Sequence, residues 1–493
     1  MTRVSRSVVR VLSVSSAVAL ACAALFAGAC TRASEAPRPR HLILVTVDTL
    51  RADHLSAYGS ARGTSDAPGA AKRGSTPGFT LDELAAQGTR FAQAYTARGE
   101  TFPSLCALFS GKPPPETGVL GNRETLPASA ATLAERLRDA GFATAAFTTN
   151  KLLVPGSGIE QGFSAFESDF SDDRDERVLA RARAWLAAQP LESRAFVWVH
   201  LMGPHLPYEP RPSNGVDFAR LFADPKYAGP ANGSREFVDA AYTQQRPLTD
   251  ADRARLVDLY DGEIARVDQL VSRFAADLAR PRADGANTLD ESLFVFCADH
   301  GEELGERSGY FGHSKSISSA VLHVPLFLRF PRGVKAGGAR DEVVLLEDVK
   351  PTVLALFGLD TERGAHGLAL DALARGERDA RFDGRVAVGL WRFSIFTVAD
   401  AGHRLVFNPE KREPEEIPPG PYPIPEQALY DRKADPRELV DVSSRDVERV
   451  KALQAALRAW MRGLTPSTDA QSPLSPERIR ALSEQGYAGG DEK

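Results

Sequence analysis

Two aspartates in the chain directly follow short apolar runs, and a histidine follows the second of them. Asp48 comes after residues 41–47, and Asp299 and His300 come after residues 293–298. Apolar runs of this kind predict strands that are buried on both faces of a parallel sheet. Because the carboxyl ends of such strands meet at one edge, we expect these three side chains to lie together. Two carboxylates with an imidazole suit zinc or manganese better than magnesium, so the pattern predicts a divalent metal site.

A threonine hydroxyl is available to complete such a site. Thr101 stands just before residues 103–109, which are predicted to form a helix with a proline near its first turn. The positive end of that helix would stabilise an oxyanion at the threonine and an incoming anion. Coordination to the same metal ion would lower the pKa of the hydroxyl and make it a nucleophile. His205 and His313 could hold ester oxygens or protonate a leaving group.

Each of these residues has a more ordinary interpretation when it is taken alone. A single aspartate at a strand end is usually a turn or capping residue, and Thr101 alone would more often be a helix N-cap. Their joint occurrence in one order is what favours a metal-assisted ester hydrolase. Four other histidines are predicted to be structural or exposed: His54, His323, His366 and His403.

The composition fits a globular enzyme. The chain has 493 residues, of which 43% are hydrophobic and 25% charged, and this excludes a mostly disordered or collagen-like protein. Its net charge of -5 gives no cationic surplus, so no nucleic-acid partner is expected. Four cysteines are too few for a disulfide scaffold. Cys106 and Cys297 stand in apolar surroundings and are expected to be buried free thiols.

The first thirty residues are predicted to be an export signal. Three arginines within the first ten residues precede an uncharged stretch, residues 11–29, that ends at Cys30. This pattern resembles a bacterial lipoprotein signal, in which residues 1–29 are removed and Cys30 receives a lipid; a plain secretory signal or a single membrane anchor are the alternatives. The expected location is the membrane of the cell envelope, facing the periplasm or the outside, with residues 30–40 as a tether.

Predicted strands and helices alternate along the rest of the chain, which favours a doubly wound α/β sheet. The expected strands are residues 41–47, 142–148, 196–201, 293–298 and 324–330. The expected helices are residues 79–87, 103–109, 130–140, 250–278, 346–357 and 445–461. A proline-rich stretch, residues 410–428, interrupts the pattern before the last helix.

Four segments in this order resemble the sulfatase family of the alkaline phosphatase superfamily. They are residues 47–55, 101–111, 200–208 and 298–313, and further matches lie at 260–268, 324–326, 347–352 and 429–438. The resemblance implies an alkaline-phosphatase-like three-layer α/β sandwich with a large mixed, mostly parallel sheet. It also implies a small C-terminal antiparallel sheet with one helix. The expected parts are a catalytic domain, a small subdomain and a polar tail, at residues 41–375, 376–465 and 466–493.

The chain departs from true sulfatases at residues that carry their chemistry. Thr101 stands where the family has the Cys or Ser that is oxidised to formylglycine, and Leu105 stands where it has a recognition arginine. Threonine cannot give that aldehyde. The family's calcium-binding acidic pairs are here Asp48 with Thr49, and Asp299 with its following histidine. These departures imply manganese or zinc rather than calcium.

The metal-binding set resembles that of phosphodiesterases and phosphoglycerol or phosphoethanolamine transferases of the same superfamily. This similarity implies one metal ion, because no further aspartate is identified for a second. It also implies attack on phosphorus by the threonine through a phosphothreonine, with His205 and His313 at the remaining oxygens or the leaving group. The predicted metal ligands are Asp48, Thr101, Asp299 and His300. The predicted substrate contacts are Asn150, Lys151, His200 and Lys315.

Four functions are compatible with these residues. Hydrolysis of phosphate or phosphonate esters is favoured, and hydrolysis of sulfate esters without formylglycine is the first alternative. A head-group transferase is less favoured, because those enzymes usually carry several membrane helices and this chain has one short apolar segment. A non-catalytic surface lipoprotein is disfavoured by the intact metal-binding set. The expected partners are a small-molecule, glycan or lipid ester and, through the N-terminal lipid, a membrane.

Overall fold

A computed structural model describes the chain from residue 38 to residue 469, apart from short internal segments. The described ranges are 38–242, 245–307, 309–361, 366–391, 394–410 and 424–469. The predicted signal segment, the predicted lipid site at Cys30 and the end of the predicted polar tail lie outside these ranges. Within them, no helix is both long and apolar enough to cross a membrane.

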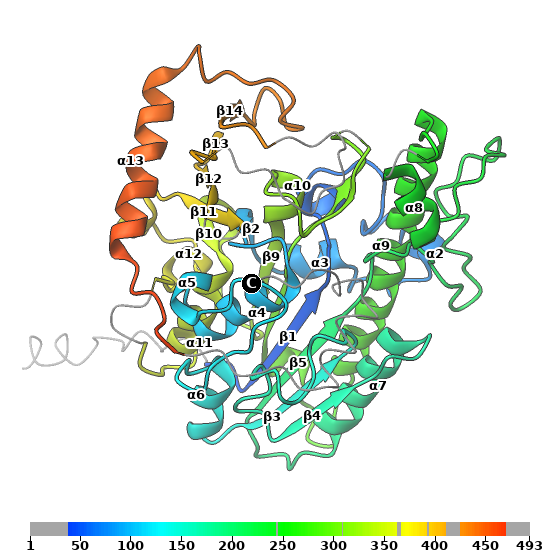
Figure 1. The fold of residues 1–493 in the computed structure, drawn as a ribbon. Helices are drawn as coiled ribbons and strands as arrows, with labels where there is room; N and C mark the ends of the chain where they lie inside the picture. The colour runs from blue at the N-terminus through cyan, green and yellow to red at the C-terminus, as the bar shows by residue number, and fades with distance from the viewer. Residues whose placement is uncertain are drawn as a thin grey trace, which may run out of the picture. The chain divides into compact units, whose positions relative to one another are not determined.

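A mixed sheet of eight strands forms the larger sheet of the fold, with the order β10-β2-β9-β6-β1-β5-β3-β4 (Figure 1). β9 runs antiparallel to β2 and β6, and the other paired strands of this sheet are parallel. The strands are β1 (His41–Val47), β2 (Gly88–Tyr95), β3 (Ala143–Thr148), β4 (Ala165–Ser168), β5 (Ala195–Leu201), β6 (Ser292–Ala298), β9 (His323–Arg329) and β10 (Gly338–Leu345). The large, mostly parallel sheet expected from the sequence is thereby confirmed.

The central strands β1, β5 and β6 are buried along their whole length. Helices cover both faces of these strands, which is why each one is an unbroken apolar run in the sequence. The sequence does not predict β2 and β10, because partly exposed residues interrupt their apolar pattern. Cys106 and Cys297 are buried, and neither forms a disulfide with another described residue, as expected.

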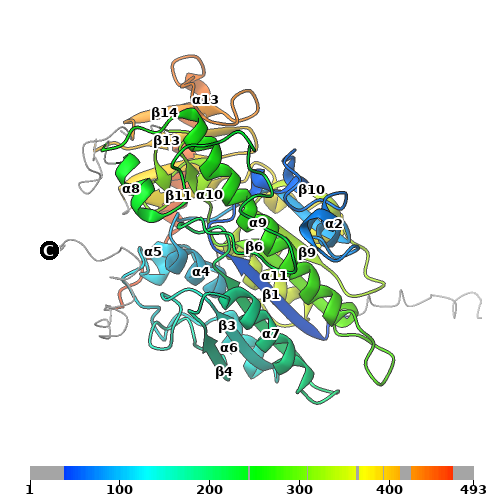
Figure 2. The ribbon, with the colours of Figure 1, turned by 90° about the vertical axis from the view of Figure 1, so that its right-hand side faces the viewer.

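Two groups of helices cover the two faces of this sheet (Figures 1 and 2). In Figure 2, α7 and α9 lie in front of the sheet, and α7 contacts β3 and β5. The helices of this group are α2 (Ala70–Arg73), α3 (Leu81–Ala86), α7 (Arg174–Ala187) and α9 (Asp250–Leu278). The helices of the other group are α4 (Thr101–Ser110), α5 (Pro114–Thr117), α6 (Leu133–Asp139), α11 (Val349–Leu356) and α12 (Asp371–Ala374). In this group α4 contacts α5, α6 and α11, and α11 contacts α12.

A second, four-stranded antiparallel sheet with one helix follows the large sheet, as the family resemblance implies. Its strands are β11 (Ala387–Trp391), β12 (Ile395–Ala399), β13 (His403–Phe407) and β14 (Gln427–Asp431). The helix α13 (Val447–Gly463) buries Val450, Leu453 and Leu457 against this sheet. α13 repeats apolar residues at helical spacing, so the sequence alone predicts it at nearly the observed position.

The remaining elements are short and lie mostly in the connections after strands. They are α8 (Arg235–Tyr242), α10 (Ser319–Leu322), the pair β7 (Glu303–Leu304) and β8 (Phe311–Gly312), and the 3-10 turns η1 (Ala52–His54), η2 (Ser56–Tyr58), η3 (Leu289–Glu291), η4 (Leu346–Asp348) and η5 (Ala380–Phe382). The helix expected over residues 346–357 is thus divided into η4 and α11.

The helix that carries the predicted nucleophile starts earlier than the sequence predicts. α4 begins at Thr101 instead of near Pro103, and Glu100 is its N-cap residue. Glu100 gives no side-chain cap; instead Asn122 Oδ1 accepts the backbone N–H of Phe102 at 2.9 Å. This cap comes from a residue remote in sequence, so local sequence patterns could not place the helix start. The correction puts Thr101 in the first turn of the helix.

Candidate active site

The carboxyl ends of three neighbouring strands bring the predicted ligands together. β1 lies between β5 and β6, and its register places Thr46 beside His200 on one side and Val47 beside Ala298 on the other. Asp48 therefore leaves β1 next to Asp299, which leaves β6. The side chains of these two aspartates and of His300 are completely buried.

The geometry of these three residues suits a metal ion. One ligand atom from each of Asp48, Asp299 and His300 lies within 4.8 Å of the others. His300 Nε2 is 3.7 Å from Asp48 Oδ1 and 3.6 Å from Asp299 Oδ2. Both of these oxygens are buried, and neither has a hydrogen-bond partner among the described residues. Buried oxygens of that kind are costly, and a bound cation would satisfy them.

His300 is oriented to serve as a ligand. Its Nδ1–H donates to the carbonyl oxygen of Gly301 at 2.9 Å, which leaves the Nε2 lone pair directed at the two carboxylates. Gly301 itself cannot carry a side chain, because a Cβ there would lie 2.1 Å from the backbone oxygen of Ala320. The imidazole and the buried carboxylates together suit a divalent cation.

Thr101 joins this cluster from the start of α4. Its hydroxyl oxygen is 3.4 Å from Asp48 Oδ2 and 3.4 Å from His300 Nε2, and the side chain is completely buried. Both distances are long for direct hydrogen bonds. The hydroxyl also lies in the first helical turn, where the helix dipole favours negative charge. The structure therefore brings the four predicted ligands into one cluster.

Two residues predicted to contact substrate lie against Asp48. Asn150 Nδ2 donates to Asp48 Oδ2 at 2.6 Å, and His200 Nε2 is 3.5 Å from the same oxygen. His200 Nδ1 is 2.8 Å from the hydroxyl of Thr46, which also accepts the indole N–H of Trp198 at 2.9 Å. These contacts fix the orientation of the Asp48 carboxylate. Substrate contact by Asn150 and His200 stays a prediction.

Two further histidines extend the cluster on the other side. The rings of His300 and His313 are 4.3 Å apart, and those of His205 and His313 are 5.4 Å apart. Both added rings donate their Nδ1–H to a backbone carbonyl, of Gly99 for His313 and of Leu206 for His205. The three rings thus form a row beside the carboxylates, where the sequence predicts catalytic histidines.

The electrostatics of the cluster depend on burial. Burial raises the pKa of Asp299 well above its usual range, and the Asp48 charge raises it further. Burial also opposes ionisation of Asp48, but the nearby histidines, first among them His205, keep its pKa well below the usual range. Burial lowers the pKa of His205 to about 4 and lowers the pKa of His300 and His313 as well. Neutral imidazoles of this kind can accept protons or bind metal ions.

The two lysines that are predicted to contact substrate lie close in sequence to Asn150 and His313. Lys151 follows Asn150, and Lys315 lies two positions after His313; both side chains are half-buried. Each already takes part in an interaction within the protein. Their contact with substrate stays a prediction.

Tyr260 on α9 is a site-supporting residue that local patterns in the sequence do not identify. Thr49, directly after Asp48, has a positive φ of 53°, which is uncommon for a residue other than glycine. The Tyr260 hydroxyl donates to the Thr49 carbonyl at 2.7 Å and accepts the Arg51 N–H at 3.0 Å. Tyr260 therefore holds the strained backbone that presents Asp48. The resemblance to the sulfatase family includes residues 260–268, but it does not indicate this role of Tyr260.

We expect Tyr260→Phe to weaken both folding and metal binding. The substitution leaves a buried carbonyl and a buried N–H without a partner, which costs about 1–3 kcal/mol each. Loss of a residue that positions a metal ligand typically lowers metal affinity by about 10- to 100-fold. Chemical denaturation and metal titration measure both effects. Tyr227→Phe is the control, because that hydroxyl also has two hydrogen bonds, to Asp252 and Ala231; equal metal affinities in the two variants would contradict the role of Tyr260.

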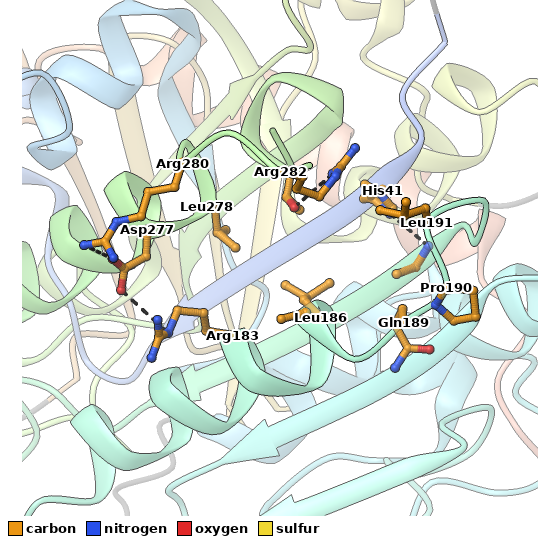
Figure 3. Close-up of a pocket in the computed structure, with 13 residues that line it drawn as sticks. His41, Arg183, Leu186, Gln189, Pro190, Leu191, Asp277, Leu278, Arg280 and Arg282 are labelled. Carbon is orange, nitrogen blue, oxygen red and sulfur yellow. Dashed lines mark hydrogen bonds and ion pairs between the residues drawn. The ribbon is translucent and has the colours of Figure 1, made fainter. Parts of the chain in front are cut away.

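A separate cavity of about 320 Å³ lies at the opposite end of β1 (Figure 3). It is lined by His41, the first residue of β1, whereas Asp48 follows the last. Its charged residues are largely paired, as in the contacts of Asp277 with Arg280 at 2.8 Å and Arg183 at 3.6 Å. None of the predicted site residues lines this cavity. The chemistry of the chain is therefore concentrated at the carboxyl end of the sheet.

Comparisons with known proteins agree with this geometry. Residues 40–359 match the profile of the family described as Sulfatase. The chain is 22% identical to the N-acetylglucosamine-6-O-sulfatase of Bacteroides thetaiotaomicron, over 73% of this chain and 77% of that protein. It is 25% identical to the choline-sulfatase of Rhizobium meliloti, over 74% of this chain and 77% of that protein.

The fold also matches a solved structure. The crystal structure of the phosphonate monoester hydrolase of Agrobacterium radiobacter superposes with a TM-score of 0.66 and 19% sequence identity. The superposition covers 89% of this chain and 100% of that one. The resemblance drawn from the sequence segments is confirmed: the chain belongs to the sulfatase family of ester-hydrolysing enzymes.

Proposed function

We propose that the protein is a metal-dependent hydrolase of phosphate or phosphonate esters, with Thr101 as its nucleophile. The position of the Thr101 hydroxyl, 3.4 Å from both Asp48 and His300, carries this proposal. Threonine cannot be converted to the aldehyde of formylglycine sulfatases, so its own hydroxyl must attack. The location at the positive end of α4 favours the charge that develops there.

Asp48, Asp299 and His300, with Thr101, would hold one divalent ion, manganese or zinc in preference to calcium. The imidazole ligand supports this choice, because calcium prefers oxygen ligands alone. The ion would lower the pKa of the Thr101 hydroxyl and offset negative charge on an ester oxygen. Asn150 and His200 would keep the Asp48 carboxylate in place.

The reaction is proposed to proceed in two displacements at phosphorus. In the first, Thr101 Oγ1 bonds to phosphorus and the bond to the leaving oxygen breaks. A neutral histidine of the row, His205 or His313, would accept the proton released by Thr101 and return it to the departing oxygen. In the second, a water oxygen bonds to phosphorus, the bond to Thr101 breaks, and a proton from that water restores the hydroxyl.

Sulfate-ester hydrolysis is the second candidate. It is supported by the two relatives named above as sulfatases, one of which acts by name on a sulfated amino sugar. The phosphonate monoester hydrolase of the same fold supports the phosphorus substrate. A glycan or small-molecule ester is compatible with both. A head-group transferase would need an alcohol acceptor in place of water.

A paired assay on the purified full-length protein, supplied with manganese or zinc, tests the proposed function. Its substrates are an aryl phosphodiester, an aryl phosphonate monoester and an aryl sulfate, and Thr101→Ala is the blank. We expect the two phosphorus esters to be cleaved much faster than the sulfate. Cleavage of the sulfate alone would replace the proposal by sulfate-ester hydrolysis.

We also propose that the protein is exported and lipid-anchored at Cys30. The uncharged stretch before Cys30 supports this assignment. Cells fed a labelled fatty acid are expected to incorporate the label into the wild-type protein and not into Cys30→Ala. Equal labelling of the variant, or no labelling of the wild type, would exclude a lipid at Cys30.

A further inference from the structure

A half-buried arginine stands beside the row of histidines without an acidic partner. Arg235 is the first residue of α8, and its Nη2 donates one long hydrogen bond, 3.3 Å, to the carbonyl oxygen of Leu206. Among the described residues no carboxylate oxygen comes within 4.0 Å of this guanidinium. A guanidinium has five N–H donors, so most of the hydrogen-bonding capacity of Arg235 is unused within the described protein.

The carbonyl that Arg235 contacts also belongs to the active site. Leu206 O accepts the Nδ1–H of His205 at 2.6 Å as well as the Arg235 N–H. The Arg235 guanidinium and the His205 imidazole therefore share one hydrogen-bond acceptor and lie next to each other. The positive charge of Arg235 adds to burial in lowering the pKa of His205. Arg235 thus lies next to His205, at the edge of the histidine row.

The fold fixes this position of Arg235. The connection from Tyr208 to Gly233 is closed by a hydrogen bond from the Tyr208 N–H to the Gly233 carbonyl at 2.9 Å. Gly233 has a φ of +80°, and a Cβ there would lie 2.1 Å from the backbone carbonyl oxygen of Tyr208. Only glycine therefore allows the two backbone segments to come this close. Phe237 and Val238 are buried and anchor α8. Arg235 follows this closed loop and is held next to Leu206.

We propose that Arg235 binds a second anionic group of the substrate, an oxyanion of carboxylate, sulfate or phosphate type next to the ester that is cleaved. This inference rests on the proposed function, since it assigns part of the same substrate. Leu105, where sulfatases have a recognition arginine, is completely buried and apolar. Arg235 supplies a cation from a different element, and a guanidinium pairs with oxyanions in two parallel hydrogen bonds.

Two structural roles could explain Arg235 instead. It could fasten the backbone at Leu206, or it could balance the buried Glu302, whose Oε2 accepts the Tyr208 hydroxyl at 2.7 Å and whose Oε1 is unpaired. In both cases, loss of Arg235 would affect every ligand of the site alike. Only a substrate contact would make the loss depend on whether the ligand carries a second anion.

Calorimetric binding of two phosphonates to the full-length protein separates these roles. The probes are 3-phosphonopropionate, which carries a carboxylate, and butylphosphonate, which does not; neither has an ester to cleave. We expect the wild type to prefer the carboxylated probe by about 10- to 100-fold, as for one charge-assisted contact. Arg235→Ala should lose this preference while binding butylphosphonate as the wild type does, and Arg235→Lys should keep part of it.

Arg220→Ala is the matched control, because Arg220 is highly exposed in the same segment and is paired with Asp217. It should retain the full preference. An equal loss of affinity for both phosphonates in Arg235→Ala would overturn the proposal in favour of a structural role. A preference that survives in Arg235→Ala, or a wild type that binds neither probe, would also overturn it. Failure of the proposed function is seen separately, as intact esters in the paired assay, because probe binding requires no turnover.

Discussion

Thr101→Ala is expected to abolish ester hydrolysis while leaving the protein folded and the metal bound. If Thr101 is the nucleophile, its removal should lower kcat by about 10⁴-fold or more, as for other covalent nucleophiles. The folding cost should be below about 1 kcal/mol, because both polar contacts of the hydroxyl are as long as 3.4 Å. Asp48, Asp299 and His300 remain to bind the metal. Steady-state kinetics, thermal unfolding and elemental analysis measure these three effects.

A second buried threonine provides the control for this variant. Thr144 lies at the start of β3, away from the carboxyl end of the sheet, and its hydroxyl donates to Gly162 O at 2.8 Å. Thr144→Ala should lose some stability and keep the wild-type kcat. Turnover by Thr101→Ala near the wild-type rate would contradict the mechanism in which Thr101 is the nucleophile. Thr101→Ser should retain part of the activity, because it keeps a hydroxyl.

Asp299→Asn is expected to lower metal affinity and activity together without destabilising the metal-free protein. The amide keeps an oxygen that can accept the N–H groups of His300 and Thr49, which Asp299 Oδ1 accepts at 2.7 and 3.3 Å. It removes the charge of the unpaired Oδ2. Burial, and next the neighbouring Asp48 carboxylate, disfavour that charge when no cation is bound and raise the pKa of Asp299. Metal affinity should fall by at least about 100-fold, because an anionic ligand is lost.

The comparison with a structural carboxylate makes this test specific. Asp268 is completely buried and pairs with Arg73 at 3.0 Å and Ser75 at 2.6 Å, away from the cluster. Asp268→Asn should destabilise the protein by about 1–3 kcal/mol, because Arg73 loses one of its two carboxylate partners and keeps Asp66 at 2.9 Å. It should spare metal affinity in the folded fraction. Unchanged metal content in Asp299→Asn would place the metal site elsewhere.

The proposed metal ligands could be identified from the sequence because sheet geometry brings them together. Asp48 and Asp299 follow apolar strands, and the edge of a parallel sheet places such residues side by side regardless of the loops between them. Thr101 could be named from its neighbouring proline and the family-like segment, but its place inside the first helical turn could not. That place depends on Asn122, which caps the helix from a separate loop.

The supporting residues could not be predicted from local patterns, because their roles arise from contacts across the fold. Tyr260 reaches Thr49 from the middle of a long helix, and Thr46 orients His200 from a neighbouring strand. Arg235 is the first residue of α8 and directly follows a polar connection whose sequence has no periodic pattern, so its position next to Leu206 depends on the close approach at Gly233. β2 was missed for a related reason, since its partly exposed residues break the apolar run.

The central claim is that Thr101 forms a covalent bond with the substrate phosphorus. The direct measurement is peptide mass spectrometry of the wild-type protein, quenched in acid during turnover of an aryl phosphonate. The account predicts a phosphonyl group on the peptide that contains Thr101, and its absence from Thr101→Ala treated in the same way. A phosphonyl group on any other residue, or full turnover by Thr101→Ala, would contradict the account.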